Sequence, residues 1–144
     1  MSSAPFPARR LAIVTCMDAR IDPLAALGAG LGDAHVIRNA GAMITEDAIR
    51  SLALSQRLLE TRAVAIVGHT DCGLEGLNDA AVLQEIASDA GRPPPWRPGS
   101  FEDVERHVRE SVRAVRECPY LTYRDDVRGY VLEVENGGGL REVT

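Results

Sequence analysis

Aromatic residues are scarce in this chain of 144 residues, because Phe, Trp and Tyr together make up only 4% of it. Hydrophobic residues of all kinds nevertheless reach 45%, which is normal for a globular protein. The core must therefore be built mainly from Leu, Ile, Val and Ala. A chain of this length is expected to form one domain, residues 1–144. A domain this small often gains stability by forming oligomers.

The chain also has no excess of positive charge, since its formal net charge is −5. This balance argues against nucleic acid or an anionic membrane surface as the main partner. No apolar run approaches the length of a membrane span. The first ten residues have no apolar centre of the kind found in secretory signal peptides. We therefore expect a cytoplasmic protein.

Cysteine occurs only three times, at Cys16, Cys72 and Cys118. An odd number of cysteines in a chain without a signal peptide does not favour a disulfide framework. Cys118 follows a helical pattern and is interpreted as an ordinary structural cysteine. Metal binding or catalysis is the better interpretation for Cys16 and Cys72.

Apolar runs and helical patterns alternate along the chain, which favours an α/β fold with a mostly parallel central sheet flanked by helices. We expect about four parallel strands and a C-terminal antiparallel strand. The predicted strands are residues 11–15, 34–38, 63–67, 130–134 and 140–143, the last of them after a turn at 136–139. The predicted helices are 46–60, 74–88 and 101–116, with a short one that begins at Pro23.

Two clusters of polar residues directly follow the first and third predicted strands. Residues 16–20 read Cys-Met-Asp-Ala-Arg, and residues 69–73 read His-Thr-Asp-Cys-Gly. Functional groups gather beyond the carboxyl ends of the strands in open parallel sheets. If the two strands are neighbours, both clusters emerge at the same edge. Extended backbone would also place Cys16, Asp18 and Arg20 on one side.

Together the clusters supply two thiolates and one imidazole, which suit zinc and leave a fourth coordination position free. Cys16, His69 and Cys72 are therefore predicted to bind zinc. A free position distinguishes a catalytic zinc from a structural one. A tight turn into a helix at about Leu74 is expected to bring His69 and Cys72 onto one metal. The start of that helix would stabilise the Cys72 thiolate, with Asp71 as a candidate cap.

The motifs Cys16-x-Asp18-x-Arg20 and His69-x-x-Cys72-Gly73 resemble the signature of the β-class carbonic anhydrases. The likeness covers most of residues 10–90 and looks closest to the short subgroup that lacks a long N-terminal helical arm. The resemblance implies one Zn²⁺ per subunit on Cys16, His69 and Cys72, with Asp18 and Arg20 as the catalytic pair. It also implies an obligate homodimer, or a higher oligomer, with the active site at or near the dimer interface.

The resemblance further implies reversible hydration of CO2 to bicarbonate by a zinc-bound hydroxide. Asp18 would orient this nucleophile, and Arg20 would hold the carboxylate bidentately and keep it ionised. Asp18 could instead leave Arg20 and fill the fourth zinc position, which closes the site. Pro7 stands where many longer members have a glutamine that donates a hydrogen bond to the substrate. Substrate orientation must then rely on other groups, or the substrate is not CO2.

Two alternative functions keep the same zinc ligands. A hydrolase of carbonyl sulfide or carbon disulfide would differ only in how its substrate reaches the metal. Ala42, Met43 and Ile44 could line an apolar pocket on that route, or could simply pack in the core. A non-catalytic zinc module would have Asp18 permanently on the metal, but Arg20 would then be unnecessary.

A thiol redox protein is a weaker alternative, because Cys16 and Cys72 do not form a C-x-x-C motif. Other polar residues near the clusters are interpreted as structural or solvated. His35 is expected to be structural, and His107 is expected to be solvated in a charged helix. Asp33 and Arg38 could pair near the site or bracket a strand, and no proton shuttle can be identified.

Overall fold

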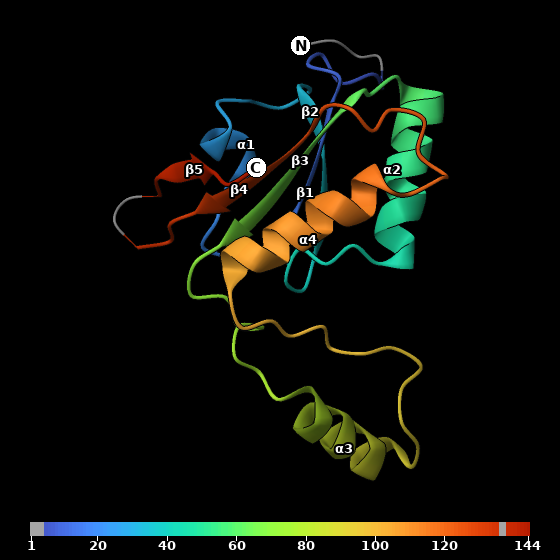
Figure 1. Ribbon diagram of the computed structural model, residues 1–144, viewed down its shortest axis with the longest axis vertical. Coiled ribbons are helices and arrows are strands. Elements are labelled where there is room, and N and C mark those ends of the chain that lie inside the picture. Colours follow the sequence, from blue (N-terminus) through green and yellow to red (C-terminus); the bar gives the residue numbers. More distant parts are fainter. Residues whose placement is uncertain (1–4, 136–137) are drawn as a thin grey trace.

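The computed structural model describes residues 5–135 and 138–144 and has a five-stranded sheet with helices against it (Figure 1). The strands are β1 (Leu11–Cys16), β2 (Ala34–Asn39), β3 (Ala63–His69), β4 (Val127–Leu132) and β5 (Leu140–Glu142). The helices are α1 (Pro23–Ala26), α2 (Glu46–Leu59), α3 (Asp79–Ala90) and α4 (Val104–Arg116). In the described ranges, no helix is both long enough and apolar enough to cross a membrane.

The sheet has the strand order β2-β1-β3-β4-β5. β1 pairs in parallel with β2 and β3, β3 pairs in parallel with β4, and β5 is antiparallel to β4. The predicted fold class, with four parallel strands and a C-terminal antiparallel strand, is therefore confirmed. Thr15 lies opposite Val67, so β1 and β3 end at the same edge of the sheet. The two polar clusters therefore emerge at the same edge, as expected for neighbouring strands.

Several predicted helix starts are confirmed by their caps. The side chain of Asp22 accepts a hydrogen bond from Ala25 at the start of α1, and that of Thr45 accepts one from Ala48 at the start of α2. α4 begins later than predicted, because Asp103 provides its N-cap. Such caps satisfy backbone N–H groups that the first turn of a helix leaves without partners.

The boundaries of β4 and α3 differ from the prediction. β4 begins at Val127, three residues before the predicted start, because Val127 is already fully buried in the sheet. α3 begins only at Asp79, after its cap Asn78, so the predicted helical start at Leu74 is wrong. Residues 136 and 137 of the predicted turn lie outside the described residues.

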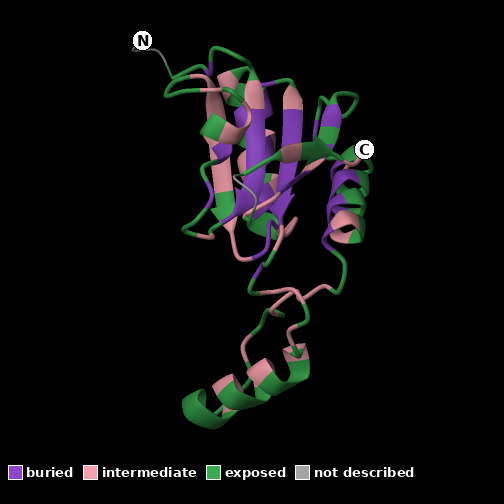
Figure 2. Cartoon of the chain, turned by 90° about the vertical axis from the view of Figure 1, so that its left-hand side faces the viewer, coloured by how far each residue is buried: buried purple, intermediate pink, exposed green. Residues whose placement is uncertain are grey.

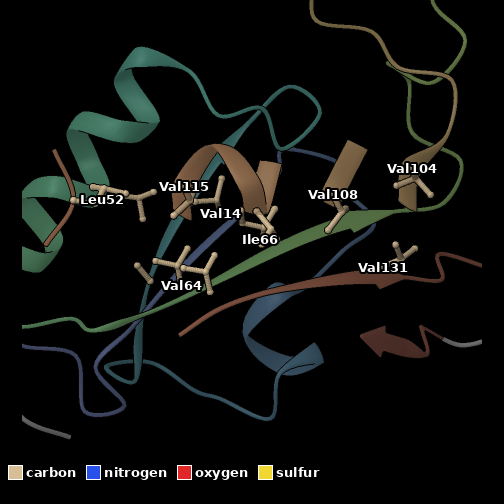
Figure 3. Packing of buried hydrophobic residues seen from close by; sticks show 12 residues of the cluster. Val14, Leu52, Val64, Ile66, Val104, Val108, Val115 and Val131 are labelled. Carbon is tan, nitrogen blue, oxygen red and sulfur yellow. The ribbon is translucent and has the colours of Figure 1, made fainter. Parts of the chain in front are cut away.

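The core is built from aliphatic side chains on both faces of the sheet, as the composition predicts. The buried residues are concentrated in the strands of the sheet (Figure 2). α2 and α4 cover one face, where Val, Leu and Ile side chains interlock (Figure 3). α1 covers the other face, and the cluster there includes both Cys16 and Cys72. α3 has no buried residue and extends away from the sheet with its flanking loops (Figures 1 and 2).

Two glycines allow α4 to lie very close to the sheet. A Cβ atom at Gly68 in β3 would be 2.7 Å from Cγ2 of Val108, and one at Gly129 in β4 would be 2.6 Å from Cγ1 of the same valine. Real Cβ atoms do not approach other carbons this closely, so any side chain at either position would push α4 outwards. Val108 is itself fully buried. The fit of α4 on β3 and β4 therefore requires both glycines.

We predict that Gly129→Ala lowers the free energy of unfolding by about 1–3 kcal/mol, because the added methyl group overpacks the contact with Val108. Urea unfolding measures this change. Gly30→Ala is the matched control, since the nearest atom to its new Cβ would be an Asp33 carboxylate oxygen at 4.0 Å. Equal unfolding midpoints for the two variants would contradict the close packing of α4.

Candidate metal centre

Three side chains with metal-binding atoms meet where β1 and β3 end. Cys16 is the last residue of β1, His69 is the last residue of β3, and Cys72 follows three residues later. Their sulfur and nitrogen atoms all lie within 4.8 Å of one another. All three are buried, with exposed fractions of 4%, 1% and 7% in that order. The structure thus brings together the three residues that the two sequence motifs single out.

The orientation of His69 leaves one ring nitrogen available for a metal ion. Nδ1 lies 2.7 Å from the carbonyl oxygen of Thr70, which can only accept, so Nδ1 carries the proton. Nε2 then has a free lone pair, and it is buried with no hydrogen-bond partner among the described residues. A buried polar atom without a partner costs about 1–3 kcal/mol. A metal ion between Nε2 and the two sulfurs would supply the missing partner, so the residues present fit a metal.

The two thiols affect each other strongly because they are buried side by side. The neighbouring Cys72 side chain lowers the pKa of Cys16 against the effect of burial, and the Gly41 amide contributes to the same shift. The interaction with Cys16, together with burial, raises the pKa of Cys72. Without a metal, the pair therefore shares one proton. Metal binding must displace that proton and becomes weaker as the pH falls.

Asp18 and Arg20 form a bidentate ion pair beside the three buried side chains. Arg20 Nε lies 3.0 Å from Asp18 Oδ1, and Arg20 Nη2 lies 2.8 Å from Asp18 Oδ2. These bonds hold the pKa of Asp18 well below its usual range, so the carboxylate stays ionised. Asp18 Oδ2 is also 3.7 Å from Nε2 of His69. A fixed negative charge therefore lies next to the candidate metal position.

Arg20 also connects the loop after β1 to the loop after β3. Its Nη1 lies 2.9 Å from Asp71 Oδ2, and its Nη2 donates to the Asp71 carbonyl oxygen at 2.8 Å. Asp71 has a positive φ of 55°, which turns its carbonyl towards this arginine. A single guanidinium therefore holds both polar clusters in place, a role that the sequence does not reveal.

Two predictions about the segment after Cys72 are wrong. Asp71 does not cap α3, and the start of α3 does not stabilise the Cys72 thiolate, because α3 begins at Asp79 after its cap Asn78. The intervening segment instead pairs across the fold: the Gly76 amide donates to the Phe101 carbonyl at 2.8 Å. Gly76 has a φ of +76°, which a continuous helix does not allow. The sulfur of Cys72 is thus positioned by a non-helical turn.

Arg38 supports the loop that carries Cys16 and Asp18, a role that the sequence does not predict. Its Nε donates to the Cys16 carbonyl at 2.8 Å, and its Nη2 donates to the Asp18 carbonyl at 2.7 Å. It does not pair with Asp33, whose carboxylate accepts from the Gly30 amide. The register places Arg38 opposite Thr15, so knowledge that β1 and β2 are adjacent would have revealed this role.

The structure confirms the prediction for His35 and contradicts the one for His107. His35 is structural as expected, because its Nδ1 lies 2.7 Å from the buried Ser55 hydroxyl. The prediction that His107 is solvated is wrong. Its ring is half-buried and stacks on Phe101, and its Nε2 lies 2.7 Å from the Gly41 carbonyl oxygen.

An apolar pocket of about 410 Å³ is lined by Met43, Leu74, Leu77 and Trp96, among others. Of the three residues predicted to line such a pocket, only Met43 does so here. Ala42 is buried at 1% exposure, and Ile44 packs against the core cluster beneath α2 and α4.

Comparison with known proteins gives consistent results. Residues 11–133 match the family described as "Carbonic anhydrase". The chain is 46% identical over 138 residues to Beta-carbonic anhydrase 1 of Mycobacterium tuberculosis, which covers 96% of this chain and 84% of that protein. It is 33% identical over 150 residues to a carbon disulfide hydrolase of Acidithiobacillus thiooxidans, which covers 90% and 75% of the two chains.

Solved structures of related proteins have the same fold. The carbonic anhydrase of Streptococcus mutans matches with a TM-score of 0.91 and 35% identity, over 100% of this chain and 87% of that one. The apo form of a carbon disulfide hydrolase matches with a TM-score of 0.86 and 30% identity, over 97% and 81% of the two chains.

We predict that Cys72→Ser greatly reduces metal binding, because a serine hydroxyl is a poor replacement for a thiolate on a soft or borderline metal. The affinity for zinc should fall by more than about 100-fold, the upper end of what is lost when only a residue hydrogen-bonded to a metal ligand is removed. Chelator competition and the zinc content of the purified protein measure this loss. Cys118→Ser is the control and should keep the full metal content. Equal zinc affinity in the two variants would show that the metal is bound elsewhere.

Proposed function

Since the chain belongs to the β-class carbonic anhydrases, we propose that it interconverts CO2 and bicarbonate with one zinc ion per subunit, bound by Cys16, His69 and Cys72. The observation that carries this proposal is the buried group of two sulfurs and the unpartnered His69 Nε2. Structural zinc sites use four protein ligands, whereas catalytic sites use three and keep one position for water or substrate. Three ligands therefore favour a catalytic site.

When bound, the zinc acts as a Lewis acid and makes a water molecule nucleophilic near neutral pH. His69 would hold the zinc through Nε2, because the Thr70 carbonyl keeps the proton on Nδ1, and this hydrogen bond makes the imidazole a better electron donor. Cys16 and Cys72 would hold it as thiolates. Two thiolates donate more charge than neutral imidazoles would, so the surrounding groups must help to activate the water.

We propose that Asp18 is this helper. Its carboxylate is ionised, is mostly shielded from solvent and lies 3.7 Å from His69 Nε2. It can therefore accept a hydrogen bond from the attacking water and orient it towards the carbon of CO2. Arg20 acts on Asp18 in two ways, since the bidentate pair fixes the direction of the carboxylate and prevents its protonation.

The same pair offers a gate. Asp18 would close the site by leaving Arg20 and occupying the fourth position on the zinc. Arg20 opposes this movement because its guanidinium is also anchored on Asp71 through two bonds. The open site is thus favoured while Arg20 holds both aspartates.

We further propose that the protein works as a homodimer in the cytoplasm. α3 buries no side chain within the subunit, and large apolar residues such as Leu58 and Trp96 are exposed at 65% and 57%. A second copy of the chain would cover such surfaces. Free cysteines at the proposed ligand positions suit a reducing compartment, which favours the cytoplasm.

Hydrolysis of carbon disulfide or carbonyl sulfide is the second candidate function. It is favoured by the 33% identity to carbon disulfide hydrolases and by the apolar pocket beside Met43 and Leu74. We prefer CO2 because the identity to a β-carbonic anhydrase is 46% over 96% of this chain, whereas carbon disulfide hydrolases that match over a similar length are 32–33% identical. A zinc module without catalytic activity is less favoured, since it would not need the Asp18–Arg20 pair.

We predict that the zinc-loaded protein hydrates CO2, and that Arg20→Leu lowers kcat/KM by about 10- to 100-fold. Without Arg20, the pKa of Asp18 rises towards its usual value, so Asp18 becomes protonated at a higher pH. As the pH is lowered, the variant should therefore lose activity earlier than the unaltered protein. Stopped-flow assays of CO2 hydration across the pH range measure both effects. Arg50→Leu is the control, because Arg50 makes only an exposed pair with Asp47.

The same preparation should be assayed with carbon disulfide and carbonyl sulfide. Turnover of either compound without CO2 hydration would replace the proposed function by the second candidate. A full zinc content with no turnover of any of the three substrates would instead point to the non-catalytic module.

A further inference from the structure

His107 connects helix α4 to the loop that passes beside the metal centre. The residue lies in the first turn of α4, and its Nε2 is 2.7 Å from the carbonyl oxygen of Gly41. A carbonyl oxygen only accepts, so Nε2 carries a proton and donates it. The imidazole also stacks on Phe101, with ring centroids 4.1 Å apart and planes inclined by 5°. Stacking and hydrogen bonding together fix the ring in one orientation.

Gly41 in turn contacts a proposed metal ligand. Its amide donates to the sulfur of Cys16 at 3.4 Å, and this contact is buried. The two hydrogen bonds of Gly41 are made by the peptide groups on either side of its α-carbon, one to Cys16 and one to His107. Gly41 has a φ of +85°, in the left-handed region that glycine adopts without steric cost. The backbone of a glycine is also more flexible than that of any other residue. Without an anchor on its carbonyl side, the amide would be free to turn away from the sulfur.

The rest of this loop is braced at its two ends. Asn39 binds Met43 twice, through Nδ2 to the Met43 carbonyl and through Oδ1 from the Met43 amide, both at 2.8 Å. The Asn39 carbonyl also accepts from the Met17 amide at 2.8 Å. Gly41 lies at the middle of the loop, between these braces. There, His107 binds the Gly41 carbonyl, whereas the Gly41 amide donates to the sulfur of Cys16.

We propose that His107 is a positioning residue for the metal centre, which holds the Gly41 amide on the Cys16 sulfur through its bond to the Gly41 carbonyl. This inference rests on the proposed function, since it requires a metal ion on Cys16, His69 and Cys72. An N–H donor stabilises negative charge on a thiolate and directs its lone pairs. Loss of the His107 bond should therefore change both the affinity for metal and the electronic character of the sulfur–metal bond.

Two substitutions separate the hydrogen bond from the stacking. His107→Phe keeps an aromatic ring against Phe101 but has no donor for Gly41. His107→Gln loses the ring, yet its amide group can reach the Gly41 carbonyl as a donor. Each purified variant is loaded with Co²⁺, which gives a visible and near-ultraviolet spectrum where Zn²⁺ gives none. The sulfur-to-cobalt charge-transfer band and the Co²⁺ affinity, from chelator competition, are compared with those of the unaltered protein.

We expect His107→Phe to bind Co²⁺ about 10-fold or more weakly, which is the range for losing a group that supports a metal ligand through hydrogen bonds. Its charge-transfer band should move to longer wavelength, because the sulfur loses a donor that stabilised its charge. His107→Gln should restore most of the affinity and the original band. Urea unfolding of the metal-free proteins shows whether the variants fold equally well.

An unchanged affinity and band in His107→Phe would overturn the inference while leaving the proposed function intact. Equal losses in His107→Phe and His107→Gln would also overturn it, because the donor would then not be what matters. Absence of any sulfur-to-cobalt band in the unaltered protein would overturn the metal site itself and the inference with it. If His107→Phe does not fold, nuclear magnetic resonance of the unaltered zinc-loaded protein decides. A His107 Nε2 proton that exchanges rapidly with water contradicts the proposed bond.

Discussion

The parallel pairing of β1 with β3 is the constraint on which the rest of the site depends. Because Thr15 lies opposite Val67, the two strands end together, and the residues that follow them are forced into the same small volume. The hydroxyl of Thr15 strengthens this register with a further bond to the Val67 carbonyl at 2.8 Å. Cys16, His69 and Cys72 are thus gathered by the sheet rather than by local sequence. Arg20 then fixes the geometry by binding both loops that leave the sheet.

The packing of α4 serves the core and the site at once. Gly68 lies directly before His69 and allows Val104 and Val108 to rest on β3, in the core shown in Figure 3. The same close approach carries His107 to Gly41, next to the sulfur of Cys16. A change that lifts α4 from the sheet should therefore loosen the metal centre as well as the core.

Much of this arrangement follows from local sequence signals. Apolar runs of strand length mark β1, β2 and β3, and the Cys16 and His69 motifs at their ends single out the three side chains that the structure brings together. The roles of Arg38 and His107 could not be predicted in this way, since they depend on strand order and on how closely α4 packs. The helix that the sequence predicts from Leu74 does not begin there, for a similar reason. Its apolar pattern continues through Gly76, but pairing with the distant Phe101 competes with helix formation there and delays the start of α3 to Asp79.

The central claim is that Cys16, His69 and Cys72 hold one zinc ion and leave the fourth coordination position to an oxygen atom. X-ray absorption at the zinc edge tests it most directly on the zinc-loaded protein. We expect two sulfur neighbours at about 2.3 Å, one imidazole nitrogen at about 2.0–2.1 Å and one further oxygen neighbour at a similar short distance. A spectrum with four sulfur neighbours, or with none, would contradict it.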